Sequence, residues 1–305
     1  MIGMPGRSFR GPLPPLTPAE QALAPDLRRD VEELADVMGE RNFLRHAALE
    51  HAADYVEARL GGATRQTYRV GPKPFHNLEL ELPGGGRPEE IVVLGAHYDS
   101  VVGCPGANDN GTGTAALLAL AAAFRGAKPA RTLRFVAFTN EEPPHFQTPD
   151  MGSFVYARRC RERGEKVVAM LSLETVGCYS DEDGSQSYPP PVSFFYPSRG
   201  NFIAFVANRS SRGLVRRVVR SFREKASFPS EGASLPGWIT GVGWSDQWSF
   251  WQHGYEGVMV TDTAPFRYRH YHTPEDTPDK VHYECTARVV GGLEAVVRSL
   301  AGLPE

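Results

Sequence analysis

The sequence has few cysteines, little net charge and no long apolar run, and each shortage excludes a class of protein. Four widely spaced cysteines in 305 residues, with no CxxC pair, are no disulfide framework, so we expect reduced thiols and a cytoplasmic protein. A formal net charge of −3 gives no strong attraction to nucleic acid or anionic lipid. No stretch reaches the roughly 18 apolar residues of a membrane span, and the N-terminus has no apolar signal-peptide core. The absence of a GxSxG motif disfavours a serine hydrolase of the nucleophile-elbow type.

The pattern of apolar residues alternates between strand and helix types along the chain. Strands are predicted at 64–70, 77–83, 91–97, 132–138, 167–174, 191–197 and 257–263. Helices are predicted over 17–60 with a break near Gly39, at 111–124, 151–163 and 285–300, and as a pair within 201–225. This alternation predicts a three-layer α/β/α sandwich with a mixed, largely parallel central sheet. We expect one domain over residues 16–305, preceded by a flexible tail at 1–15 that is rich in proline and glycine.

Acidic and histidine side chains follow the carboxyl ends of the predicted strands. They come from five separate segments and are His97 with Asp99, Asp109, Glu141 with Glu142, Glu174, and His272. In open α/β sheets, ligands bind at this edge. Several buried carboxylates repel one another unless a cation lies among them. Carboxylate and imidazole together suit zinc or a similar divalent metal, so the sequence predicts a metal site here.

Four short motifs occur in a fixed order, and together they carry a resemblance to a known family. They are GAHYDS (95–100), GANDNGTG (106–113), NEE (140–142) and HTPEDT (272–277). From about residue 75 onwards the chain resembles the co-catalytic zinc aminopeptidases of metallopeptidase family M28. The resemblance implies a zinc-peptidase-like fold and two zinc ions, with other divalent metals as alternatives.

The same resemblance implies a role for each residue of the set. The carboxylate of Asp109 would bridge the two metal ions, and the peptide bond between Asp109 and Asn110 would be cis. One ion would also be held by His97 and Glu174, and the other by Glu142 and His272. The family more often has aspartate where this chain has Glu174.

Two further acids have implied roles beside the metal ligands. Asp99 would orient the imidazole of His97. Glu141 would be the general base for a metal-activated water. Neighbouring side chains on a strand point in opposite directions, so Glu141 and Glu142 can serve one site only where the backbone turns beyond the strand.

A segment near the C-terminal third of the chain is the predicted substrate side of the site. Residues 227–245 are rich in proline, glycine and serine and are expected to form a rim or lid. Asp246 resembles a site acid of the aminopeptidase relatives. Trp248, with Trp244 as its alternative, and Tyr271 are expected to form walls of the substrate pocket.

Three functions remain open on the sequence alone. The leading one is an aminopeptidase, a metal-dependent exopeptidase that acts on a peptide or aminoacyl substrate with a free N-terminus. The alternative is a single-zinc glutaminyl cyclase, an aminoacyltransferase of the same fold that shares the HYDS sequence at 97–100. A non-catalytic binding module is disfavoured because the five ligands and the base are all retained. The oligomeric state is left open.

Overall fold

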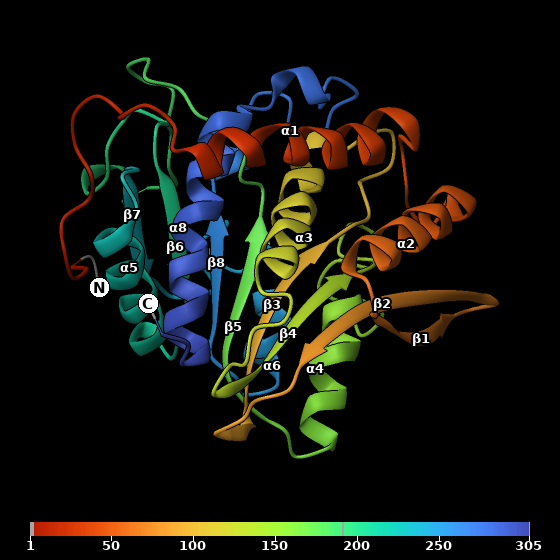
Figure 1. Ribbon diagram of the computed structural model, residues 1–305. Coiled ribbons are helices and arrows are strands. Elements are labelled where there is room, and N and C mark those ends of the chain that lie inside the picture. The colour runs from red at the N-terminus through yellow and green to blue at the C-terminus, as the bar shows by residue number, and fades with distance from the viewer. Residues whose placement is uncertain (1–2, 191, 305) are drawn as a thin grey trace.

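An eight-stranded mixed sheet forms the centre of the computed structural model, which describes residues 3–190 and 192–304 (Figure 1). The strand order is β1-β2-β4-β3-β5-β8-β6-β7. The inner strands β4, β3, β5 and β8 run parallel to one another, whereas β2 pairs antiparallel with β1 and β4, and β6 pairs antiparallel with β8. The strands are β1 Thr64–Val70, β2 Lys73–Leu82, β3 Arg87–His97, β4 Arg131–Phe138, β5 Lys166–Glu174, β6 Ile203–Ala207, β7 Ser230–Ser234 and β8 Gly257–Thr261.

Helices cover both faces of the sheet, which confirms the predicted three-layer sandwich. On one face lie α1 Pro18–Glu32, α2 His46–Leu60, α3 Gly113–Ala123, α5 Arg212–Lys225 and α8 Tyr283–Ala301. On the other lie α4 Gly152–Glu162 and the short α6 Gln247–Gln252; α7 Ala264–Arg267 is a single turn. No helix within the described residues is both long enough and apolar enough to cross a membrane.

The central strands are apolar throughout because both of their faces are buried. In β3, Val92 and Leu94 pack toward the α3 and α8 side, whereas Ile91 and Val93 pack toward α4. Since side chains alternate along a strand, a strand between two helical layers needs apolar residues at every position. This pattern made the inner strands the most readable part of the sequence.

The segment 192–225 corrects two of the predictions. Residues 203–207, expected in a helix, form strand β6, and only α5 fills the rest. A five-residue apolar run is too short for its period to separate strand from helix. Within 192–197, expected as a strand, the structure has a short 3-10 helix at Val192–Phe194, and Pro191 lies outside the described residues. Phe194 is 85% exposed, and the prolines around this segment lack the N–H that a strand ladder needs.

One smaller detail also differs from the sequence prediction. Strand β2 begins at Lys73, so the hairpin turn is shorter than the 71–76 loop that we expected.

The segment 3–15 has no helix or strand, and hydrogen bonds join it to the body of the protein. Ser230 donates its backbone N–H to Ser8 Oγ at 2.8 Å, and Arg288 donates to the Pro14 carbonyl at 2.5 Å.

Candidate metal centre

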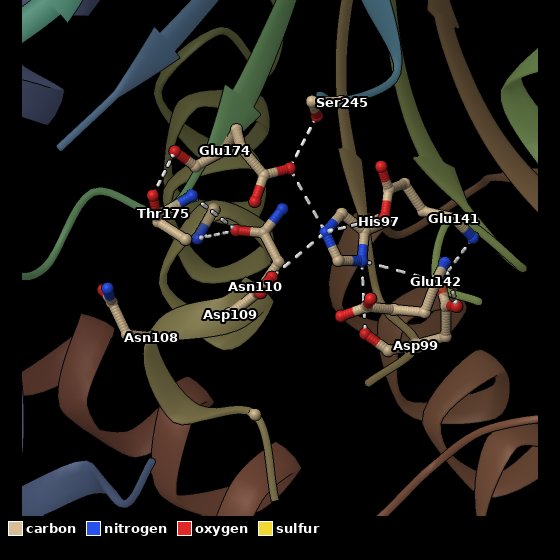
Figure 2. A network of polar contacts seen from close by, with 12 residues as sticks. His97, Asp99, Asn108, Asp109, Asn110, Glu141, Glu142, Glu174, Thr175 and Ser245 are labelled. Carbon is tan, nitrogen blue, oxygen red and sulfur yellow. Dashed lines mark hydrogen bonds and ion pairs between the residues drawn. The ribbon is translucent and has the colours of Figure 1, made fainter. Parts of the chain in front are cut away.

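Most of the predicted site residues stand at or just beyond the carboxyl ends of neighbouring strands. His97 is the last residue of β3 and Glu174 the last residue of β5. Glu141 and Glu142 follow β4 within four residues, and Asp109 precedes α3. Because β4, β3 and β5 are adjacent and parallel, their carboxyl ends bring these side chains into one cluster (Figure 2).

The side chain of Asp109 lies between two imidazoles. Its Oδ1 is 3.4 Å from His97 Nε2, and its Oδ2 is 3.0 Å from His272 Nε2. A second carboxylate accompanies each imidazole: Glu174 Oε2 is 3.2 Å from His97 Nε2, and Glu142 Oε2 is 3.3 Å from His272 Nε2. The five side chains thus form two three-residue groups that share Asp109.

The polar atoms of this cluster fit divalent metal ions. His97 Nε2, Asp109 Oδ1, Glu142 Oε1 and His272 Nε2 are buried, and none has a hydrogen-bond partner among the described residues. Buried polar atoms without partners are costly, and clustered carboxylates are more so. Two imidazoles and three carboxylates are a donor set that zinc accepts, with three donors available to each ion when Asp109 is shared.

Burial and charge shift the acid–base properties of these groups. Burial alone lowers the pKa of His97, but the carboxylates of Glu174 and Glu141 raise it well above its ordinary value. The pKa of His272 rises to about 10 against the same effect of burial, because Asp109 and Glu142 face the imidazole. Burial and the charge of Asp109 raise the pKa of Glu142 to about 7. The cluster therefore retains positive charge strongly, as protons or as metal ions.

Asp99 contacts both the β3 end and the loop after β4. Its carboxylate accepts the backbone N–H of Glu141 at 3.1 Å and that of Glu142 at 3.2 Å. His97 Nδ1 lies 3.2 Å from the Asp99 carbonyl oxygen and 3.6 Å from its carboxylate. A proton on Nδ1, shared with these oxygens, leaves Nε2 free to face the other ligands. Asp99 thus acts on three site residues, two more than the sequence indicated.

The two adjacent glutamates diverge into the same site from a turn. Asn140 has a φ of 56°, so the chain bends immediately before Glu141. Glu142 faces His272, whereas Glu141 Oε2 lies 3.9 Å from His97 Nε2. Burial raises the pKa of Glu141 well above its ordinary value. A carboxylate with a raised pKa accepts a proton readily, as a general base must.

Two residues that the sequence reasoning did not select hold Glu174 in place. Ser245 Oγ donates a 2.5 Å hydrogen bond to Glu174 Oε2 (Figure 2). Asn110 Nδ2 donates to the Leu173 carbonyl at 2.8 Å, and Asn110 Oδ1 accepts the Thr175 N–H at 3.1 Å. The Asp109–Asn110 peptide bond is cis, as the family resemblance predicted. The position of Asn110 beside Asp109 in the GANDNGTG motif was the available signal for its role.

Two further buried acids support the loop that contains Asp109. Asp276 accepts the backbone N–H groups of Asn108 at 2.8 Å and of Asp109 at 3.1 Å. Asp262 accepts the side-chain amide of Asn108 at 3.0 Å. Asp276 belongs to the HTPEDT motif, which could have revealed it, whereas nothing in the sequence singles out Asp262.

The predicted substrate-side residues are only partly brought together. Tyr271 stacks on the imidazole of His272 with ring centroids 3.8 Å apart, and it lines the cavity over the cluster together with Trp244. Trp248 does not line this cavity; its ring lies 6.0 Å from that of Phe154. Asp246 is fully buried, and neither carboxylate oxygen has a hydrogen-bond partner among the described residues. Of the two tryptophans considered, Trp244 is therefore the one at the cavity.

Comparison with known proteins agrees with the geometry. The sequence model of peptidase family M28 matches residues 77–297. The uncharacterized protein YfbL of Escherichia coli is 34% identical over 92% of this chain and 88% of its own length. Aminopeptidase YwaD of Bacillus subtilis is 41% identical over 68% of this chain, which spans only 40% of that protein.

Solved structures of similar fold include zinc aminopeptidases and glutaminyl cyclases. BSAP, a zinc aminopeptidase from Bacillus subtilis, superposes with a TM-score of 0.57 at 24% identity, over 77% of this chain and 52% of that one. Fimbriiglobus ruber glutaminyl cyclase superposes with a TM-score of 0.64 at 18% identity, over 95% and 97%. At these identities the likeness shows the fold alone.

The family match and the relatives together place the chain. It belongs to peptidase family M28. The chain spans about half or less of the length of the relatives that are named as aminopeptidases.

Proposed function

We propose that the protein is an aminopeptidase that removes the N-terminal residue of a peptide with a free α-amine, using two zinc ions. His97, Asp109 and Glu174 would hold one ion, and Asp109, Glu142 and His272 the other. Other divalent metals with similar preferences would also fit this donor set. A cytoplasmic location stays our prediction from the cysteine usage.

One observation carries this proposal. The two carboxylate oxygens of Asp109 face different imidazoles, at 3.4 Å and 3.0 Å, and each imidazole has its own second carboxylate. A single ion would use only one of these two groups. The symmetrical arrangement supports a two-metal site, in which zinc supplies Lewis-acid polarisation of the scissile carbonyl and activation of water.

The residues of the chain contribute the proton transfer and its positioning. Glu141 would accept a proton from the attacking water and deliver it to the leaving amine, since its carboxylate lies beside the candidate metal ligands, 3.9 Å from His97 Nε2. Asp99 fixes the backbone of Glu141 and Glu142 together, so base and ligand retain their spacing. Trp244 and Tyr271 line the same cavity and would limit access of bulk water.

Product analysis tests this function against the alternatives. A panel of free-amine peptides, their N-acetylated forms and a peptide with N-terminal glutamine would be incubated with the zinc-loaded protein and resolved by mass spectrometry. We expect release of the first residue from the free-amine peptides and none from the acetylated ones. Loss of ammonia from the glutamine peptide with no cleavage would favour a cyclase, and no change in any peptide would favour a binding module.

A further inference from the structure

A row of paired residues connects the metal cluster to the far edge of the sheet. The strand register pairs Glu174 with Thr261, Thr261 with Ala204, and Ala204 with Glu231. Paired residues in neighbouring strands point to the same face, so these four side chains share one face. Strands are about 4.8 Å apart, which sets the Glu231 backbone about 14 Å from that of Glu174.

An apolar cavity lies over this row. The neighbouring row, Met259, Val206 and Ala233, completes its floor. Much of the remaining lining is aromatic and includes Tyr188, Tyr196, Phe202, Phe266, Trp244 and Tyr271. This cavity shares Glu174, Trp244 and Tyr271 with the cavity over the metal cluster, so the two cavities adjoin each other.

Glu231 is the one acid in this lining other than the metal-site residue Glu174. Within the part of the chain that the structure describes, its carboxylate accepts no hydrogen bond. The nearest cation, Arg223 Nη2, is 4.0 Å away. That guanidinium instead donates to the carbonyl and hydroxyl of Ser230. Burial raises the pKa of Glu231 against the opposing charges of Arg223 and Arg10. The cavity thus ends in a carboxylate that lacks a donor.

Two tyrosine rings accompany this carboxylate. The hydroxyl of Tyr196 lies 3.0 Å from the carbonyl oxygen of Gly232, the residue that follows Glu231, and burial together with the charge of Glu231 raises the pKa of Tyr196 to about 12. The hydroxyls of Tyr188 and Tyr196 already donate to the carbonyls of Pro197 and Gly232. Tyrosine rings beside a carboxylate are a favourable setting for a cation, because the ring faces attract positive charge.

We propose that Glu231 selects peptides whose N-terminal side chain has an apolar stem and a cationic end, as lysine and arginine do. This inference rests on the proposed aminopeptidase function. A lysine side chain extends about 6 Å from its Cα, and its hydrogen bond adds about 3 Å. Lysine and its hydrogen bond thus cover about 9 Å of the roughly 14 Å between the Glu174 and Glu231 backbones, and the side chain of Glu231 would span the remaining 5 Å or so. A leucine side chain is too short to take part.

The carboxylate of Glu231 also disfavours substrates whose N-terminal side chain is purely apolar. A methyl group in place of an ammonium would leave Glu231 partly buried, with the Arg223 guanidinium at 4.0 Å and no hydrogen-bond donor, which is unfavourable. A site built to pair with a polar group discriminates strongly against an analogue that lacks it. Because Glu231 is 28% exposed, we expect discrimination of about tenfold, at the low end for a charge-assisted hydrogen bond.

The test compares lysine with norleucine, which lacks only the ε-ammonium of lysine. The ratio of kcat/KM for the p-nitroanilides of these two residues would be measured for the zinc-loaded protein, for Glu231→Gln and for Glu224→Gln. Glu224 is an exposed acid of α5 and serves as the matched control. We expect a ratio of about ten in the parent and the control, and a ratio near one in Glu231→Gln. A parent ratio near one, or an unchanged ratio in Glu231→Gln, overturns the inference.

A binding measurement separates this inference from the proposed function. If neither anilide is hydrolysed, the aminopeptidase proposal fails, and calorimetric titration with L-lysine and L-norleucine then tests Glu231 directly. About tenfold tighter binding of lysine, lost in Glu231→Gln, retains the selectivity. Equal binding of the two amino acids overturns it. Hydrolysis of both anilides at equal rates leaves the function standing and rejects the selectivity alone.

Discussion

Ser245 Oγ donates a 2.5 Å hydrogen bond to Glu174 Oε2, and this contact fixes the orientation of the Glu174 carboxylate in the metal cluster. The hydroxyl of Ser245 also lies 2.8 Å from the hydroxyl of Ser172, which is two residues before Glu174 on β5. Glutamate has one more rotatable bond than aspartate, so it needs an extra contact to retain one orientation. The hydroxyl pair supplies that contact.

Replacement of Ser245 by alanine should weaken the binding of the metal ion that His97 would hold. The change removes the donor but leaves the charge and the backbone in place, and loss of such an outer contact typically costs 10–100-fold in metal affinity. Competition with a chromophoric chelator would measure it. Ser249→Ala is the matched control, because Ser249 is a buried serine of α6 that pairs with Ser153 and contacts no ligand. Equal affinity in both variants would rule out the role of Ser245.

Shortening Glu174 to aspartate should also weaken the binding of this metal ion. The carboxylate would retreat by about 1.5 Å, one C–C bond, whereas metal–ligand distances tolerate a few tenths of an ångström. Glu174→Ala should weaken the ion further, with the site of Glu142 and His272 less affected. Chelator titration that follows metal content and activity together would show this. Two tightly bound ions in Glu174→Ala would mean that Glu174 is not a ligand.

Glu141→Gln should retain both metal ions and the fold but lose activity. The substitution preserves size and the backbone contacts with Asp99, and removes only the proton acceptor. A general base contributes about 10²–10⁴-fold, so kcat should fall within that range. Glu142→Gln, by contrast, should lose metal. If Glu141→Gln turned over substrate within a few-fold of the parent, another group would have to be the base.

Asp99→Asn should disturb both sides of the site. The asparagine amide has one oxygen, which can still accept one backbone N–H. Its NH₂ group would face the other backbone N–H, that of Glu141 or of Glu142, so two donors would oppose each other. We expect a lower melting temperature of the metal-loaded protein and a lower kcat. Differential scanning calorimetry with steady-state kinetics would test both effects. Unchanged stability would show that Asp99 does not hold the loop after β4.

The sequence was informative where burial or chemistry imposes a repeated pattern. The strands β3, β4 and β5 were predictable because both faces are buried, and the acids and histidines at their ends could be grouped by topology alone. Strand β6 was missed because its five residues show no readable period. Its location is decided by pairing with β7 and β8, which no local pattern encodes.

The supporting contacts of the site were less predictable than its candidate ligands. Ser245 and Asp262 lie 71 and 154 residues from the groups that they contact, Glu174 and Asn108, and no spacing rule joins them. Trp248 was selected by its position in an aromatic segment, but the short helix α6 directs it to Phe154 instead of the cavity. Tertiary packing determines these contacts and the direction of the Trp248 side chain, and no local sequence pattern indicates them.

The number of metal ions per chain tests the central claim most directly. The protein would be equilibrated with zinc, freed of loosely bound ions by gel filtration, and measured by elemental mass spectrometry with a matched protein concentration. We predict two zinc ions per chain, because Asp109 presents one oxygen to each of two ligand groups. One ion at saturation, with full activity, would contradict the two-metal aminopeptidase and favour the single-zinc chemistry of a cyclase.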